Sequence, residues 1–131
     1  MGCSSPRESV VTALLVAVAG GLGAVARLLV DGLIKVRRPG IVPWQTAVIN
    51  VTGSLLVGFA ASAIGTGPHL DWHAVLAVGF CGGYTTMSTA SVETVTLLRT
   101  GRSLTAFGYV GVSLVLSLTA CAIGIWLGHR V

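Results

Sequence analysis

The composition of this chain of 131 residues excludes a water-soluble domain, because 53% of the residues are hydrophobic and only 9% are charged. A soluble domain carries about 25% charged residues, which it needs to cover a water-facing surface. The net charge of +4 does not indicate nucleic acid, since most of the basic residues lie in two short segments and form no stripe with aromatic residues. We therefore predict an all-α integral membrane protein, with a single domain over residues 1–131 whose surroundings are the lipid bilayer.

Four apolar segments are long enough to cross a bilayer, which takes about 20 helical residues. In chain order they cover residues 10–30, 44–64, 72–98 and 104–127. Charged or turn-forming sequence separates them, at residues 35–40, 65–68 and 99–102. Trp44, Trp72 and Trp126 fall at segment ends, where indole rings favour the membrane interface. We predict four transmembrane helices in these positions.

The first segment carries one charged side chain, Arg27, near its end. A long basic side chain in this position can extend to the lipid headgroups. It can also stand at the mouth of a pore, where a fixed positive charge raises the local concentration of anions. The residues of the segment leave both interpretations open.

A polar stripe runs along the second segment and another along the fourth. The members of each stripe are four residues apart, so they share one helix face: Thr46, Asn50, Ser54 and Gly58 on the second, and Tyr109, Ser113, Ser117 and Cys121 on the fourth. One interpretation is a narrow path lined with hydroxyl and amide donors. The other is that the Ser and Thr side chains bond to carbonyls of their own helix, while the Asn bonds to a neighbouring helix.

The third segment is longer than a span requires and contains the sequence GGYTT at residues 82–86. Glycines and hydroxyl residues at this depth can interrupt a helix, provided that protein, a water-filled cavity or an ion satisfies the freed backbone groups. They can also allow two helices to pack closely, which composition alone favours. Glu93 is the only acid well inside a segment, and it is a candidate functional residue whose partner the sequence does not identify.

No catalytic constellation is present in the sequence. We find no nucleophile paired with a base, no phosphate-binding loop and no set of Cys and His ligands. We therefore do not expect an enzyme.

Three motifs, in order, resemble those of the Fluc (CrcB) fluoride channels. They are GGLGAVAR at residues 20–27, TAVINVTGS at 46–54 and GFCGGYTTMST at 79–89. The resemblance extends over essentially the whole chain, because the length and the number of spans agree as well. It implies a third helix broken near mid-membrane, an antiparallel dimer with two pores, and a central structural sodium ion held by backbone carbonyls.

The resemblance also implies roles for particular residues. The carbonyls of Gly82 and Thr85 would hold the sodium ion, and Arg27 would lie near the vestibule. The implied fluoride path comprises Asn50, Thr46, Ser54, Met87, Tyr109, Ser113 and Ser117. The implied function is passive export of cytoplasmic fluoride across a bacterial plasma membrane, which reduces fluoride toxicity.

One departure from the family pattern affects the third motif. The family places two phenylalanines where this chain has Met87 and Ala90, and neither side chain offers the positive ring edge that would contact fluoride. A non-conducting partner subunit of a heterodimeric channel is therefore one alternative. Another is a small proton-coupled multidrug exporter, which needs a carboxylate in its first helix, and residues 10–30 contain none.

The distribution of basic residues predicts the orientation. The loops after the first and third segments carry Lys35, Arg37, Arg38, Arg99 and Arg102, whereas the opposite side carries only Arg7 and Arg130. Lys and Arg near helix ends favour the cytoplasm, so we expect both termini outside. A chain that pairs antiparallel with itself must insert in both orientations and should show almost no such bias. The clear bias of this chain therefore favours an oppositely oriented paralogous partner.

Overall fold

The computed structural model describes residues 6–64 and 71–131, and all the elements in these residues are helical. In chain order they are α1 (Pro6–Arg37), α2 (Trp44–Ala63), η1 (Ala74–Phe80, π-helical), α3 (Cys81–Tyr84), α4 (Met87–Arg99) and α5 (Ser103–Gly128). Helices α1, α2 and α5 are each long and apolar enough to cross a membrane. The fourth predicted span corresponds to the run from η1 to α4, so the all-α fold is confirmed.

Helix α1 is longer than the span predicted at residues 10–30, because it begins at Pro6 and ends at Arg37. Lys35, which we expected in a loop, lies in its last turn and forms an ion pair of 2.7 Å with Asp31 one turn earlier. Basic side chains at a helix C-terminus also interact favourably with the helix dipole. The expectation that the first helix lacks a carboxylate therefore holds only for its central part, since α1 contains Glu8 and Asp31.

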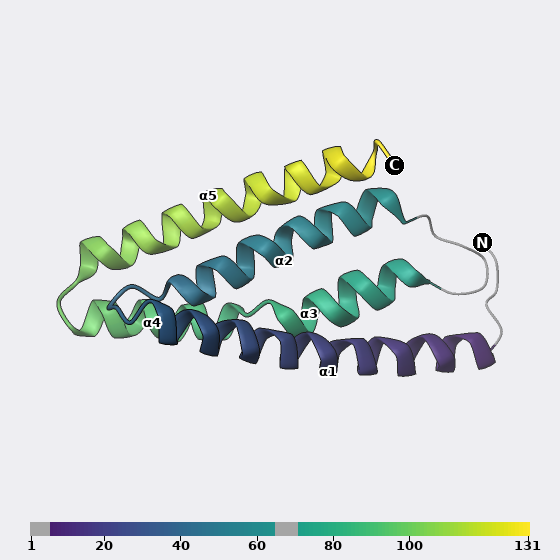
Figure 1. Cartoon of the computed structure of the whole chain (residues 1–131), viewed down its shortest axis with the longest axis horizontal. Helices are drawn as coiled ribbons and strands as arrows, with labels where there is room; N and C mark the ends of the chain where they lie inside the picture. Colours follow the sequence, from purple (N-terminus) through teal and green to yellow (C-terminus); the bar gives the residue numbers. More distant parts are fainter. Residues whose placement is uncertain (1–5, 65–70) are drawn as a thin grey trace.

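The other bounds lie close to the predictions, with α2 at Trp44–Ala63 and α5 at Ser103–Gly128. The turn predicted at residues 65–68 lies outside the described residues. Figure 1 shows that the connection between α1 and α2 and the turn between α4 and α5 lie at the same end of the molecule, with the start of α1 and the end of α5 at the other. The predicted grouping of the two basic loops is therefore correct.

The helices pack in two pairs, α2 with α5 and α1 with η1 and α3 (Figure 1). Glycines permit both contacts. A Cβ atom at Gly124 would collide with the carbonyl of Leu55, and one at Gly83 would collide with the carbonyl of Gly20. Close packing through small residues is the usual way in which helices associate in lipid, so Gly83 serves the packing role that composition favours.

Large apolar side chains cover the outer faces of the long helices. Leu22 on α1 is 60% exposed, and Gly23 is the only buried residue of that helix. A continuous apolar surface of this kind is unstable in water but suits contact with lipid or with another membrane-embedded subunit. The bilayer is therefore the solvent that this fold requires.

The glycine contact between α2 and α5 gives a prediction with a control on the same helix. Gly124→Ala should destabilise the protein by about 1–3 kcal/mol, because the new methyl group has no space against Leu55. Gly111→Ala meets no atom within 4 Å and should be neutral or slightly stabilising. Thermal unfolding midpoints in detergent measure the difference. Equal midpoints for the two variants would contradict the α2–α5 packing.

Candidate functional site

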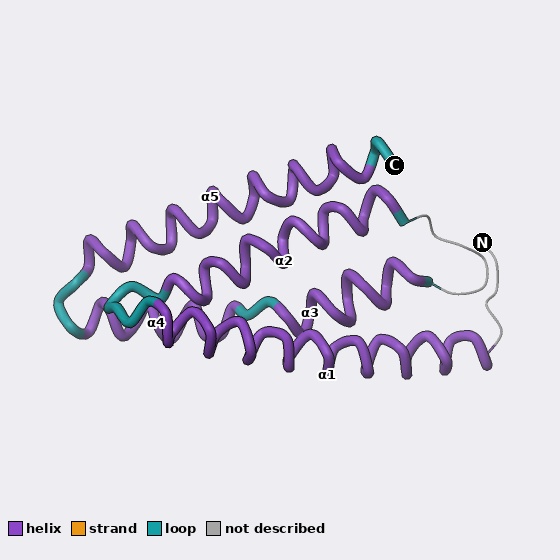
Figure 2. Tube along the Cα trace, viewed as in Figure 1, coloured by secondary structure: helices purple, strands orange, loops and turns teal. Residues whose placement is uncertain are grey.

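The third spanning segment is broken at Thr85 and Thr86, midway between Trp72 and Arg99. Thr85 has φ −78° and ψ 156°, and Thr86 has φ −146° and ψ 120°, so both residues are extended. Figure 2 shows this short non-helical stretch between α3 and α4. The predicted break in the third helix is confirmed.

The side chain of Asn50 on α2 satisfies the backbone at this break. Its Oδ1 atom accepts a hydrogen bond of 3.0 Å from the Thr86 N–H, and its Nδ2 atom donates one of 3.1 Å to the Thr86 carbonyl. The hydroxyl of Thr86 then caps α4 by accepting from the N–H of Thr89 at 3.3 Å. Because lipid offers no hydrogen bonds, these contacts allow the chain to leave the helix inside the membrane.

The same contacts free two backbone carbonyls. In a continuous helix the Gly82 carbonyl would accept from the Thr86 N–H, and the Thr85 carbonyl from the Thr89 N–H. Both of these donors are bonded elsewhere, the first to Asn50 and the second to the Thr86 hydroxyl. Gly82 and Thr85 are the residues whose carbonyls the family resemblance assigns to sodium. Carbonyl oxygens are hard ligands, so the residues present fit such an ion.

Asn50 therefore bonds a neighbouring segment, as the second interpretation of the stripe proposed. Its Nδ2 atom carries two hydrogens and uses one of them on Thr86, so a second donor remains available. The side chain is only partly buried. The expectation that Asn50 also faces a fluoride path stays a prediction.

Glu93 on α4 has three partners that the sequence did not identify. Its Oε1 atom accepts hydrogen bonds from Thr46 at 2.9 Å and from Gln45 at 3.3 Å, and its Oε2 atom accepts one from Tyr109 at 3.2 Å. The carboxylate thus joins α2, α4 and α5. Thr46 and Tyr109, which we assigned to the fluoride path, use their hydroxyl protons on this carboxylate in the isolated chain.

The serines of the two stripes behave differently from most other hydroxyl residues of the chain. Thr52, Thr94, Thr96 and Thr119 each donate to the carbonyl four residues earlier in their own helix. Within the described residues, no hydrogen bond involves the hydroxyls of Ser54, Ser113 or Ser117, which are all partly buried. These three serines therefore keep a proton that can be donated to a ligand.

The remaining predicted residues lie around these groups. Met87 begins α4 directly after the break, and its side chain is 81% exposed. The Nε atom of Arg27 is buried and has no hydrogen-bond partner in the described part of the chain. Tyr109 and Ser113 are among the residues that line an open, almost wholly apolar groove of about 490 Å³ between α2 and α5.

These features together define a multi-pass membrane protein with a helix broken inside the bilayer and hydroxyl donors along two helices. A family model described as CrcB-like protein, Camphor Resistance (CrcB), matches residues 14–125. The chain belongs to the CrcB family, which confirms the resemblance of the three motifs.

Curated relatives match the chain over most of its length. The chain is 50% identical over 117 residues to "Fluoride-specific ion channel FluC 1" of Leifsonia xyli subsp. xyli, covering 88% of this chain and 85% of the relative. It is 46% identical over 123 residues to "Fluoride-specific ion channel FluC 2" of Cutibacterium acnes, covering 92% and 99%. It is 41% identical over 122 residues to "Fluoride-specific ion channel FluC" of Rhodospirillum rubrum, covering 90% and 92%.

The contact between Asn50 and Thr86 gives a second prediction. Asn50→Ala should destabilise the protein by about 2–4 kcal/mol, because it leaves two buried backbone groups without partners. Ser54→Ala, one turn further along α2, removes no hydrogen bond of the described residues and should be nearly neutral. Thermal unfolding in detergent compares the two. An Asn50→Ala protein as stable as Ser54→Ala would show that the break does not depend on this side chain.

Proposed function

We propose that this chain is one subunit of a fluoride-selective channel that exports cytoplasmic fluoride passively. The names of its curated relatives support fluoride as the transported ion. The observation in the chain itself that carries the proposal is the set of free hydroxyl donors at Ser54, Ser113 and Ser117. No enzymatic role is proposed.

Fluoride is small and binds water tightly, so a pore must replace that water with hydrogen-bond donors. Serine hydroxyls donate without a formal charge and so do not create the deep trap that a buried Lys or Arg would. Hydrogen fluoride enters a cell as a neutral acid and dissociates inside. An inside-negative potential then drives the anion outwards with about 2.3 kcal/mol per charge per 100 mV. The chain would act in the plasma membrane of a bacterium.

The active form is an antiparallel dimer in this proposal. A hard cation takes several oxygen ligands, and the freed carbonyls of Gly82 and Thr85 supply two per chain, so a two-fold related subunit would raise the number to four. A structural sodium ion at the dimer centre would satisfy these carbonyls in the membrane. Gly82 has open space where a Cβ atom would stand, which is consistent with the approach of a partner.

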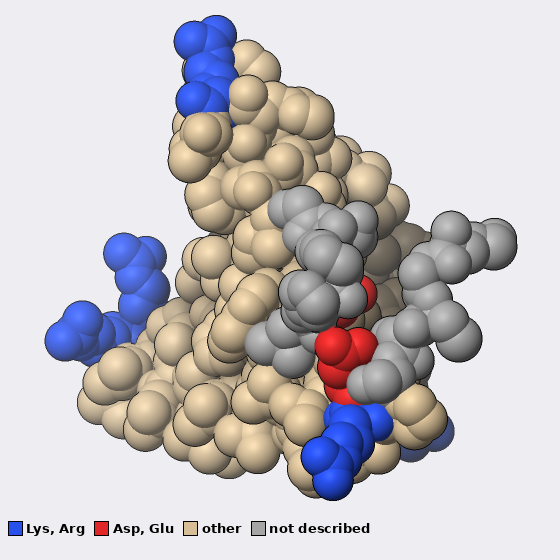
Figure 3. Space-filling view, turned by 90° about the vertical axis from the view of Figure 1, so that its right-hand side faces the viewer, with Lys and Arg blue, Asp and Glu red and all other residues tan. Residues whose placement is uncertain are grey.

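Orientation supports a heterodimer. The end with the α1–α2 connection carries Lys35, Arg37, Arg38, Arg99 and Arg102, and by the positive-inside rule it faces the cytoplasm. Figure 3 views the molecule from the opposite end, and the Lys and Arg atoms visible in it stand apart at the outline and form no single patch. Both termini would therefore lie outside. An oppositely oriented paralogous subunit would supply the aromatic residues that Met87 and Ala90 replace.

The competing exporter function has little support in α1. Its carboxylates, Glu8 and Asp31, lie towards the two ends of the helix, and Asp31 is paired with Lys35. Residues 10–30 carry no carboxylate that could bind a proton and a substrate in turn at mid-membrane.

Deletion of the gene, together with any close relative in the same cell, tests the proposed channel function. Cells should become sensitive to fluoride at mildly acidic pH, and unchanged growth would count against the channel.

The free hydroxyls give a third prediction, with a control on the same helix. Ser113→Ala and Ser117→Ala should each lower fluoride efflux from proteoliposomes by about tenfold, the effect of losing one hydrogen bond of about 1.4 kcal/mol. Thr119→Val should leave efflux unchanged, because the Thr119 hydroxyl is already bonded to the Val115 carbonyl. If all three variants conducted equally, the serine stripe would be a packing feature and no part of the pore.

The heterodimer gives a fourth prediction. The chain reconstituted alone should conduct fluoride poorly, and co-expression with an oppositely biased relative should restore efflux. Met87→Phe combined with Ala90→Phe should raise efflux of the single chain, since the Met87 side chain is exposed and a larger ring can be accommodated. Labelling of a cysteine at the C-terminus measures orientation. Robust efflux from the unchanged single chain, with equal labelling from both membrane faces, would instead indicate a dual-topology homodimer.

A further inference from the structure

Helix α2 contacts the break in the third spanning segment (Figure 2) at more than one residue. The Asn50 side chain bonds the backbone of Thr86, as described above. Gly53, which is buried and lies nearly one turn further along α2, faces the side chain of Thr85, the other extended residue of the break. The Thr85 carbonyl is one of the two that the break frees, so this second contact lies beside a candidate cation ligand.

The space at position 53 admits no side chain larger than that of glycine. A Cβ atom there would collide with the Cγ2 methyl group of Thr85 and would lie 3.3 Å from the Cδ1 atom of the Tyr84 ring. The ring is buried, and the Tyr84 hydroxyl lies 3.0 Å from that of Thr52, so the ring cannot move aside without losing this hydrogen bond. Glycine weakens a helix relative to alanine, and its presence inside α2 therefore reflects this close contact.

The Thr85 side chain is held in the orientation that requires this space. Its hydroxyl donates a hydrogen bond of 2.9 Å to the Cys81 carbonyl, and this bond selects the χ1 rotamer in which the methyl group points at Gly53. A rotation away from α2 would break the bond, which is costly in surroundings that offer no water. A methyl group at position 53 should therefore displace the backbone of Thr85, and the carbonyl moves with it.

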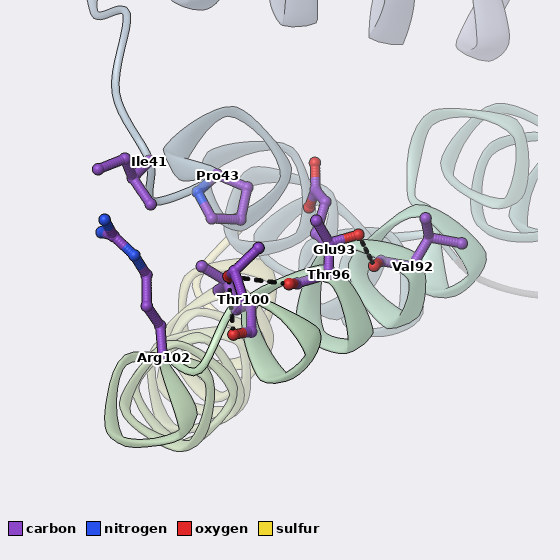
Figure 4. Close-up of a pocket in the computed structure, with 8 residues that line it drawn as sticks. Ile41, Pro43, Val92, Glu93, Thr96, Thr100 and Arg102 are labelled. Atoms are coloured by element: carbon purple, nitrogen blue, oxygen red, sulfur yellow. Dashed lines mark hydrogen bonds between the residues drawn. The ribbon is translucent and has the colours of Figure 1, made fainter.

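Helix α4, beyond the break, is held by separate contacts, which keep such a displacement local. The Glu93 carboxylate accepts hydrogen bonds from α2 and α5. The hydroxyls of Thr96 and Thr100 bond carbonyls of their own helix, as the dashed lines in Figure 4 show. A change at Gly53 should therefore alter the break and leave the outer turns of α4 in place.

We propose that Gly53 is a positioning residue for a cation site at the break: by making room for the Thr85 methyl group, it sets the place of the Thr85 carbonyl and thereby the affinity for sodium. This inference rests on the proposed function for the presence of the ion. Hard cations bind oxygen ligands within a narrow range of distances, so a displaced carbonyl should weaken binding. Replacing a residue that orients a metal ligand typically lowers the affinity by about 10- to 100-fold.

Sodium affinity can be measured without fluoride transport, from the thermal stability of the protein in its native assembly. A ligand that binds only the folded state raises the unfolding midpoint once its concentration reaches the dissociation constant. Sodium is exchanged for the large cation N-methylglucamine at constant ionic strength, so that the anion and the total salt do not change. Gly53→Ala should raise the sodium concentration at which the midpoint begins to rise by about tenfold. A purely structural defect would instead lower the midpoint equally at every sodium concentration.

Two further variants separate ligand position from packing. Gly58→Ala, on the same helix, places a methyl group against the backbone of Cys121 on α5, so it should lower the midpoint and leave the sodium response unchanged. Thr85→Ser removes the methyl group and keeps the hydroxyl, and alone it should weaken the sodium response because the contact with α2 becomes loose. Combined with Gly53→Ala it should restore the wild-type response, since the methyl group has only changed sides.

A Gly53→Ala protein with the wild-type sodium response, or an equal change in Gly58→Ala, would overturn the proposal. A Gly53→Ala protein that is defective or unfolded and is not rescued by Thr85→Ser would do the same. Absence of any sodium response in the wild-type protein would also overturn it and would remove the ion from the proposed function, while fluoride efflux would still support a channel. The expected sodium responses without fluoride efflux would contradict the channel function alone.

Discussion

The two hydrogen bonds between Asn50 and the backbone of Thr86 are the contacts on which the rest of this structure depends. A bilayer core contains no water to satisfy a freed N–H or carbonyl, so a spanning helix cannot be interrupted unless protein groups take over. The amide of Asn50 supplies one acceptor and one donor to the same residue, at 3.0 and 3.1 Å. An Ala at this position could supply neither. Asn50 therefore has a structural role, which is independent of any role in a fluoride path.

The interruption determines which polar groups are available for other contacts. It frees the carbonyls of Gly82 and Thr85, because Asn50 and the Thr86 hydroxyl take their helical donors. On the other helices, Glu93 binds Thr46 and Tyr109, while Ser113 and Ser117 keep their protons. The freed carbonyl acceptors and the free hydroxyl donors are therefore separated on different elements. An Asn50 variant could lose transport because the protein is destabilised and not because the pore is altered. Its stability must therefore be measured before the loss is attributed to the pore.

Hydropathy and charge predicted the four spans and the basic end, because they are local properties. The break in the third segment was implied by the family resemblance, since glycine content alone favoured close helix packing. The sequence did not predict that α1 reaches Arg37, since the helix continues past its apolar part through the Asp31–Lys35 pair. Nor could it identify the partners of Glu93, which come from two other helices, as far as 48 residues away. The four-residue spacing placed Thr46, Asn50 and Ser54 on one helix face. Only the tertiary structure shows that Thr46 and Asn50 are hydrogen-bonded to other segments, whereas the Ser54 hydroxyl is free. The predicted roles of these residues in a fluoride path stay predictions.

Selectivity between two halides tests the channel function most directly. Proteoliposomes are prepared with the protein in its conducting assembly and loaded with equal fluoride and chloride, and release of both ions is followed after a potassium ionophore sets the membrane potential. Free hydroxyl donors in a narrow path should release fluoride rapidly and retain chloride, which is larger and gains less from hydroxyl donors. Equal release of the two ions, or fluoride release no faster than from protein-free liposomes, would contradict a fluoride-selective channel.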